Sequence, residues 1–156
     1  MNEGKKFEED FKNSVPEDYF YYRFRDGTSS WDGGNARFQA KNICDCMIMG
    51  FDILWLIELK SFKGKSFPFG NLDLNNLDKM IEAQKKKKSR VNAIIVFNFR
   101  DLEETYMVHC DFVKHFIQNT DRKSIPISWF RDEILADRIP QTRKRTRYTY
   151  DLSEIR

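Results

Sequence analysis

The segment that decides the fold runs from Ile43 to Lys60 and reads ICDCMIMGFDILWLIELK. Its two apolar runs are separated by a turn at Gly50–Asp52, so the sequence predicts one strand over residues 37–49 and a second over residues 53–60. Most positions of both runs are apolar, which indicates a hairpin that is buried on both faces. A charged side chain within such a hairpin needs a physical explanation, because burying an unpaired charge is costly.

Three ionisable side chains converge in this hairpin. A turn at Phe51–Asp52 places Asp45 directly opposite Glu58, where facing Cβ atoms are about 5 Å apart. Lys60 lies two residues after Glu58 and projects from the same face. Adjacent carboxylates repel each other, and a divalent cation such as Mg²⁺ would relieve that repulsion through hard oxygen ligands. A buried ion pair between Lys60 and one carboxylate, holding the hairpin in register, explains the same spacing equally well.

Working outward, the hairpin is followed by alternating helices and strands. The turn-rich residues 26–35 predict a mobile loop before it. The sequence predicts helices over residues 3–14 and 73–88, the second with Asp73 as its N-cap. It then predicts strands over residues 91–99 and 105–110. A helix capped by Asp111 and a short helix after Ser128 follow. This order indicates an α/β domain with a central mixed β-sheet flanked by helices.

Length and composition exclude several classes of protein. The chain has 156 residues, which suits one domain with a single hydrophobic core, and its 15% aromatic content argues against disorder. No apolar run approaches the roughly 18 residues that cross a bilayer, and the charged start of the chain opens no signal-peptide core. Three cysteines suggest no disulfide framework. We therefore expect a cytoplasmic protein without a membrane partner.

The net charge of +3 is unevenly distributed along the chain. Residues 138–147 contain five arginine and lysine residues and no acid. This asymmetry predicts a domain over residues 1–137, followed by a basic C-terminal tail over residues 138–156. Concentrated cations of this kind favour a polyanionic partner such as nucleic acid.

The spacing of the charged residues resembles that of a known group of nucleases. Asp45, followed after 12 residues by Glu58-Leu59-Lys60, resembles the active site of the PD-(D/E)xK superfamily. The nearer resemblance is to the RecU-type Holliday-junction resolvases of Gram-positive bacteria and their phages. The segments Gly4–Glu8, Ser66–Leu72 and Arg122–Pro126 resemble parts of that family in the expected order. The resemblance implies a restriction-endonuclease-like core.

The resemblance also implies roles for individual residues. Asp45, Glu58 and Glu8 would bind Mg²⁺, for which Mn²⁺ would substitute, and Lys60 would position or deprotonate the attacking water. These four residues form the predicted catalytic set. Glu8 has a second interpretation, as a solvent-facing helix residue paired with Lys12.

Several side chains are expected to contact DNA phosphates, although ordinary surface cations would look the same. Asn76 stands where the family usually has Gln, in a position to hold water or a backbone phosphate. The aromatic residues 19–24 could stack on bases at a branch point, or pack in the core or a dimer interface. The predicted DNA-binding residues are Arg37, Lys41, Lys63, Lys65, Asn76, Arg143, Lys144, Arg145 and Arg147.

The function expected from these features is that of a homodimeric, structure-selective DNA endonuclease that cuts four-way junctions symmetrically during recombination. The family has a longer insertion before the position of Asp45 than this chain does, which leaves two alternatives open. One is a restriction-like nuclease or one that acts on flapped DNA, and the other is an inactive DNA-binding module of the same fold. A zinc site at Cys44, Cys46, His109 and Cys110 has poor ligand spacing, so buried thiols are expected instead.

Overall fold

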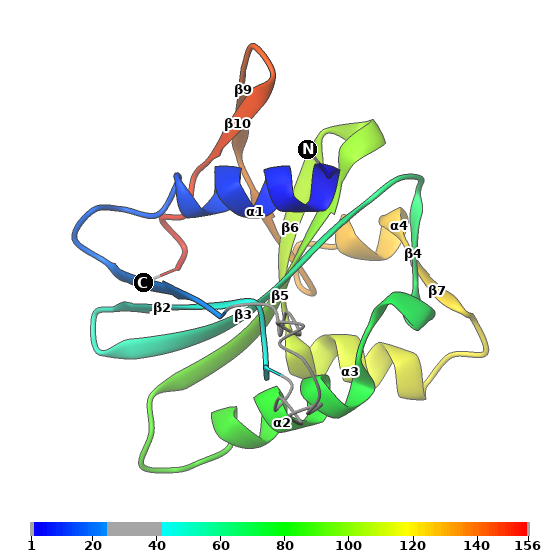
Figure 1. The fold of residues 1–156 in the computed structure, drawn as a ribbon. Coiled ribbons are helices and arrows are strands. Elements are labelled where there is room, and N and C mark those ends of the chain that lie inside the picture. Colours follow the sequence, from blue (N-terminus) through cyan, green and yellow to red (C-terminus); the bar gives the residue numbers. More distant parts are fainter. Residues whose placement is uncertain (1, 25–41, 156) are drawn as a thin grey trace, which may run out of the picture.

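The computed structural model describes residues 2–24 and 42–155, and it confirms an α/β fold with a central mixed sheet (Figure 1). The six strands lie in the order β1-β2-β3-β5-β6-β8; β3 and β5 are parallel, and the other neighbours are antiparallel. The strands are β1 (Phe20–Arg23), β2 (Cys46–Gly50), β3 (Ile53–Phe62), β5 (Val91–Phe99), β6 (Glu104–His109) and β8 (Asp137–Ile139). Two small antiparallel sheets pair β4 (Ser66–Pro68) with β7 (Ser124–Pro126), and β9 (Gln141–Lys144) with β10 (Arg147–Tyr150). This arrangement is consistent with a restriction-endonuclease-like core.

Helices cover both faces of the central sheet. Helix α1 (Glu3–Lys12) lies on one face, and α2 (Leu74–Gln84) and α3 (Cys110–Gln118) lie on the other, as Figure 1 shows. The short α4 (Ile127–Phe130) completes the second layer through Phe130. Short 3-10 turns occupy Phe69–Asn71 and Arg100–Leu102.

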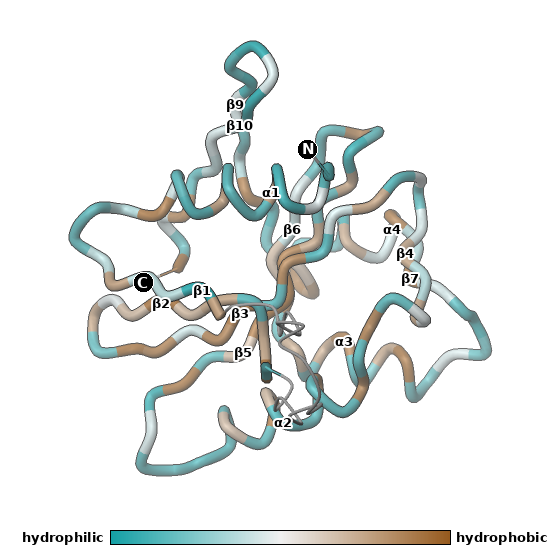
Figure 2. Tube along the Cα trace, viewed as in Figure 1, coloured by the Kyte–Doolittle hydropathy of each residue, from teal (hydrophilic) through white to brown (hydrophobic). Residues whose placement is uncertain are grey.

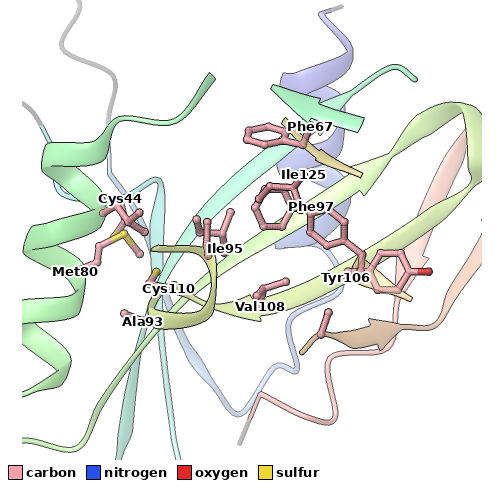
Figure 3. Close-up of a cluster of buried hydrophobic side chains, with 14 of the residues drawn as sticks. Cys44, Phe67, Met80, Ala93, Ile95, Phe97, Tyr106, Val108, Cys110 and Ile125 are labelled. Atoms are coloured by element: carbon pink, nitrogen blue, oxygen red, sulfur yellow. The ribbon is translucent and has the colours of Figure 1, made fainter. Parts of the chain in front are cut away.

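Each face of the sheet has its own hydrophobic cluster. On the α2 and α3 side, residues of β5 and β6 pack with helix residues such as Met80 and Cys110 (Figure 3). On the α1 side, Phe7 and Phe11 pack on Trp55 and Ile57 of β3. The strand β3 therefore has both faces in the core, as its sequence predicts.

The predicted register of the central hairpin is confirmed. Cys46 pairs with Ile57 and Gly50 pairs with Ile53, so the turn residues are Phe51 and Asp52. Both have left-handed backbones, with φ values of 48° and 63°. Two consecutive left-handed residues form the type I′ turn whose twist matches a two-residue hairpin.

The start of the first hairpin strand differs from the prediction. The strand was expected over residues 37–49, but β2 begins at Cys46 and residues 42–45 are not in a strand. The Asp45 amide donates to the Ile57 carbonyl at 3.2 Å, although Ile57 is already the ladder partner of Cys46. Regular alternation therefore stops here. Cys44 and Cys46, two residues apart, pack in clusters on opposite faces of the sheet, whereas a continuous strand would place both on one face. The expected mobile loop over 26–35, together with Arg37 and Lys41, lies outside the described residues.

The basic C-terminal segment is integrated into the fold. Strand β8 pairs with β6, and β9 and β10 form a hairpin that projects beyond α1 (Figure 1). Leu152 and Ile155 are buried in the α1-side cluster. The segment after the boundary predicted at residues 137–138 therefore pairs and packs with the rest of the described structure, and the domain boundary itself stays a prediction. Hydropathy alone could not show this, because the hairpin is largely hydrophilic (Figure 2).

The predicted starts of the first two helices are confirmed, but their predicted ends are not: α1 ends at Lys12 and not at residue 14, and α2 ends at Gln84 and not at residue 88. The last helix begins at Ile127, before Ser128. Asp73 is the N-cap of α2, as predicted, and its carboxylate accepts hydrogen bonds from the amides of Asn75 and Asn76 at 3.0 and 3.1 Å. Asp111 is not the N-cap of α3: that position is occupied by His109, and the Asp111 carboxylate accepts a hydrogen bond from Gln84 Nε2 at 2.8 Å. Within the described residues, no helix is long and apolar enough to cross a membrane.

The hairpin turn generates a stability prediction. Replacing Asp52 with Gly should raise the free energy of unfolding by about 0.5 kcal/mol, because Gly adopts a left-handed backbone without the steric penalty of an L side chain. Urea denaturation measures this change. Asp18→Gly is the matched control, because Asp18 is an exposed loop residue without a positive φ, and it should give no gain. Equal effects of the two substitutions would contradict the assigned turn geometry.

Candidate active site

The carboxylate of Asp45 is held against the strand that carries Glu58 and Lys60. Its Oδ2 accepts a hydrogen bond from the Leu59 amide at 2.7 Å, and its backbone carbonyl accepts one from the Phe24 amide at 2.9 Å. Leu59 is the residue between Glu58 and Lys60 on β3. The hydrogen bond therefore places Asp45 beside these two residues, although Asp45 itself lies just outside β2.

Glu58 and Lys60 project from the same face of β3, as the strand period requires. Lys60 Nζ lies 2.7 Å from Glu58 Oε1, and the two side chains are only 23% and 15% exposed, respectively. The ion pair that the sequence allowed as one interpretation is thus present. The ion pair does not exclude a metal site, because Glu58 also lies close enough to Asp45 to feel its charge, so two carboxylates remain together.

The environment of Glu58 disfavours its charged form. Burial raises the pKa of the Glu58 carboxyl, and the negative charges of Asp45 and then Asp73 raise it further. The ammonium of Lys60 opposes this shift. The raised pKa is the electrostatic consequence of crowding carboxylates in a partly dry site, and added positive charge would relieve it.

Asp73 and Asn76 lie close to Glu58 at the start of α2. Together with Glu58 they border a cavity of about 10 Å³, which is room for about one water molecule. The Asn76 side chain donates from Nδ2 to the carbonyl of Asn42 at 2.9 Å, so it ties α2 to the segment that leads to Asp45. The sequence indicated Asp73 only as a helix cap. Its position one turn before Asn76, the residue matched to the family pattern, was the signal that it lies near the active site.

Glu8 lies on α1, which covers the opposite face of the sheet. It forms an ion pair with Arg23 of β1, and not the expected alternative pair with Lys12. Arg23 is the ladder partner of Cys46, the residue after Asp45, so this ion pair lies beside the end of β2. The part of the chain that the structure describes contains no group of three or more His, Cys, Asp or Glu residues arranged to hold a metal. The metal-binding role of Glu8 stays a prediction.

Comparison with known proteins identifies the family. The family model "RecU: Recombination protein U" matches residues 17–146. The chain belongs to the RecU family. It is also 30% identical, over 175 aligned positions, to the SPbeta prophage-derived uncharacterized protein YotM of Bacillus subtilis (strain 168), covering 99% of this chain and 85% of that relative. RecU proteins form a family of Holliday-junction resolvases and are endonucleases, and membership supports that general role on DNA junctions.

Within residues 2–24 and 42–155 of this RecU-family chain, the cations expected to contact DNA occupy two places. Lys63 and Lys65 are exposed in the loop between β3 and β4, directly after the strand that carries Lys60. Arg143, Lys144 and Arg145 are exposed on the β9–β10 hairpin. Their contacts with DNA stay predictions.

Arg147 differs from the other cations of the hairpin. Its Nε lies 2.5 Å from Asp10 Oδ1 and its second guanidinium nitrogen lies 2.6 Å from Glu9 Oε2. Asp10 is 3% exposed and also accepts a hydrogen bond from the Tyr148 amide at 3.0 Å. Arg147 therefore anchors the hairpin to α1, which is a structural role that the sequence did not indicate.

The aromatic residues of β1 fall into two groups. Phe20 and Tyr22 are 56% and 47% exposed, whereas Tyr21 packs against the α1-side cluster. The alternation follows the strand period, so one of the three aromatic residues packs against the core, as one interpretation of the sequence held. The two exposed residues still allow either base stacking or an interface.

The cysteines are buried thiols, as expected. Cys44, Cys46 and Cys110 are all free and buried. Burial raises the pKa of the Cys44 thiol to about 12, and it raises the pKa values of the other two thiols as well. Neutral buried thiols are poor metal ligands and poor nucleophiles, so these residues serve packing.

The anchoring role of Arg147 can be tested on the folded protein. Arg147→Met should lower the urea midpoint of unfolding, because it leaves the buried Asp10 carboxylate without its guanidinium partner. Lys144→Met, on the same hairpin but exposed, should leave the midpoint unchanged. A midpoint for Arg147→Met equal to that of wild type would show that the hairpin does not depend on this ion pair.

Proposed function

We propose that this chain is a metal-dependent Holliday-junction resolvase that hydrolyses phosphodiester bonds in branched DNA, in the cytoplasm of a bacterial or phage-infected cell. The observation that carries the proposal is the convergence of Asp45, just before β2, with Glu58 and Lys60 of β3 in a RecU-family fold. Two carboxylates beside one lysine, partly shielded from water, are suited to the hydrolysis of a phosphodiester.

Asp45 and Glu58 are the residues that would hold a divalent cation. Their oxygens are hard donors suited to Mg²⁺ or Mn²⁺, and burial together with the charge of Asp45 raises the pKa of Glu58. When bound, such an ion supplies a Lewis acid for the phosphoryl oxygen and lowers the pKa of a bound water. Glu8 belongs to the proposed metal site through the family resemblance alone.

Each residue of the set has a role in the proposed reaction. Water attacks the phosphorus, and the bond from phosphorus to the leaving sugar oxygen breaks. Lys60, whose ammonium is paired with the Glu58 carboxylate, is placed to hold that water, and it would accept a proton from the water only as the neutral amine. Asn76 keeps the segment before Asp45 against α2, so it positions the carboxylate.

The proposal includes a homodimer, because symmetric cleavage of a four-way junction requires two active sites related by a two-fold axis. It also includes phosphate contacts from Lys63 and Lys65, which follow the catalytic strand directly. Such contacts position DNA without reading its sequence.

Metal binding should be visible in the stability of the protein. Mg²⁺ at about ten times its Kd should stabilise the fold by about 1.4 kcal/mol, which raises the melting temperature by roughly 3–5 °C. Asp45→Asn should abolish this shift while keeping an oxygen acceptor for the Leu59 amide, so the fold is retained. Glu133→Gln is the control: Glu133 is an exposed carboxylate that is not part of the proposed site, so this variant should keep the shift. An undiminished shift in Asp45→Asn would place the metal elsewhere.

Catalysis should depend on the same three residues. Asp45→Asn, Glu58→Gln and Lys60→Met should each reduce Mg²⁺-dependent nicking of a synthetic four-way junction by about 10²-fold or more, while Glu133→Gln cuts like wild type. Rates on a flap and on a plain duplex measure the selectivity. Equal rates on all three substrates would contradict junction selectivity, and tight junction binding without cleavage would identify an inactive DNA-binding module.

A further inference from the structure

A polar cavity lies on the face of the sheet opposite to Glu58 and Lys60. It has a volume of about 250 Å³ and is enclosed by the start of α1, the end of β5 and the β9–β10 hairpin. This volume is below the roughly 300 Å³ at which sites for drug-sized molecules begin. The cavity therefore suits a small group rather than a large ligand.

Two cations without counter-ions line this cavity. Lys6 and Arg100 border it, and within residues 2–24 and 42–155 neither side chain forms an ion pair or a hydrogen bond. The Nε of Arg100 is buried and has no hydrogen-bond partner. A buried guanidinium donor without an acceptor is costly, and an anion in the cavity would satisfy it.

A hydrogen-bond chain of fixed direction ends at the same cavity. The Ser61 hydroxyl donates to Asn98 Oδ1 at 3.0 Å, and Asn98 Nδ2 donates to Thr105 Oγ1 at 2.9 Å. The Thr105 hydroxyl then donates to Gln141 Oε1 at 2.6 Å. This direction uses the oxygen of Gln141, a residue that lines the cavity, as an acceptor. Its amide N–H groups form no hydrogen bond with the described residues, so they can donate to a ligand.

The carboxylates that border the cavity do not neutralise the positive charge of Lys6 and Arg100. Glu103 is occupied, because its Oε1 accepts hydrogen bonds from the Tyr148 hydroxyl at 2.6 Å and from Arg143 at 3.2 Å. Glu3 is exposed in the first turn of α1. Lys6 and Arg100 therefore outnumber the one remaining carboxylate.

Residues next to the proposed active site in the sequence contact residues at the cavity. Ser61 and Asn98 are ladder partners, and Ser61 follows Lys60 directly on β3. The Gly64 amide, in the loop that carries Lys63 and Lys65, donates to the Asp101 carboxylate at 2.9 Å, and Asp101 follows Arg100. The loop with the exposed Lys63 and Lys65 is thus hydrogen-bonded to the residue that follows Arg100.

We propose that this cavity binds a backbone phosphate of the DNA substrate, through Lys6, Arg100 and the Gln141 amide. The phosphate lies past the end of β3, on the other side of the sheet from the bond that is cut. This inference rests on the proposed function for the identity of the DNA, but the cavity itself can be tested without cleavage.

The test measures DNA binding in the absence of divalent metal. Fluorescence anisotropy with a labelled four-way junction gives the affinity as a function of salt concentration. The double variant with Lys6→Gln and Arg100→Gln should bind about tenfold more weakly near physiological salt, and the slope of log K against log salt should fall by roughly 1 for each cation removed. Lys5→Gln is the matched control, because Lys5 is an exposed neighbour on α1 that does not border the cavity, and it should change neither quantity. Glu3→Gln should strengthen binding.

A second arm separates DNA phosphate from free phosphate. Melting temperatures are measured with inorganic phosphate and with chloride at equal ionic strength, for wild type and for the double variant. Weaker DNA binding by the double variant supports the proposal, whether or not free phosphate also stabilises the wild type. Unchanged DNA binding would overturn it, and a phosphate-dependent shift in wild type alone would then assign the cavity to free phosphate. The result is independent of the cleavage assay, so loss of this proposal and loss of the nuclease proposal are distinguishable.

Discussion

The hydrogen bond from the Leu59 amide to the Asp45 carboxylate joins the two halves of the proposed active site. It spans from the irregular end of β2 to the central strand β3, which is buried on both faces by its neighbours. Because Leu59 separates Glu58 from Lys60, this one bond fixes a carboxylate beside both. Burial, and then the charge of Asp45, raises the pKa of Glu58. A cation in addition to Lys60 would relieve this strain on the charged carboxylate.

Much of this arrangement could be predicted from the sequence, because it depends on local rules. The alternation of apolar residues and the turn at Phe51–Asp52 determine the register of the hairpin, and the strand period places Glu58 and Lys60 on one face. The irregular backbone before Cys46 could not be predicted. It arises where Asp45 and Cys46 share one partner, Ile57, and no pattern of residue types marks such a site.

The role of the C-terminal segment could not be predicted either, for a different reason. Its strands are polar on the exposed hairpin, so they lack the apolar alternation that identifies a strand. What holds them is a contact between residues far apart in the chain, Asp10 of α1 and Arg147 of β10. A single sequence does not show which of its opposite charges will pair in the fold, and these two are more than 100 residues apart. The same limit applies to Glu8, whose partner in the structure is Arg23.

Helix α1 connects three parts of the molecule through three of its charged residues. Lys6 borders the polar cavity, Glu8 pairs with β1 beside the end of β2, and Asp10 anchors the basic hairpin. Its apolar residues Phe7 and Phe11 face the sheet between these contacts. The helix thus fixes the basic hairpin relative to the sheet that carries the carboxylates. An enzyme that holds a DNA backbone while cutting it needs such a fixed arrangement.

The central claim is that Asp45 and Glu58 together hold a divalent cation. Anomalous diffraction from crystals soaked in Mn²⁺ tests it most directly, because manganese scatters anomalously and replaces magnesium at oxygen sites. We predict a single strong anomalous peak, or two adjacent peaks, bridging the Asp45 and Glu58 carboxylates. Fully ordered side chains with no anomalous density between them, and with Lys60 still on Glu58 at saturating Mn²⁺, would contradict the account.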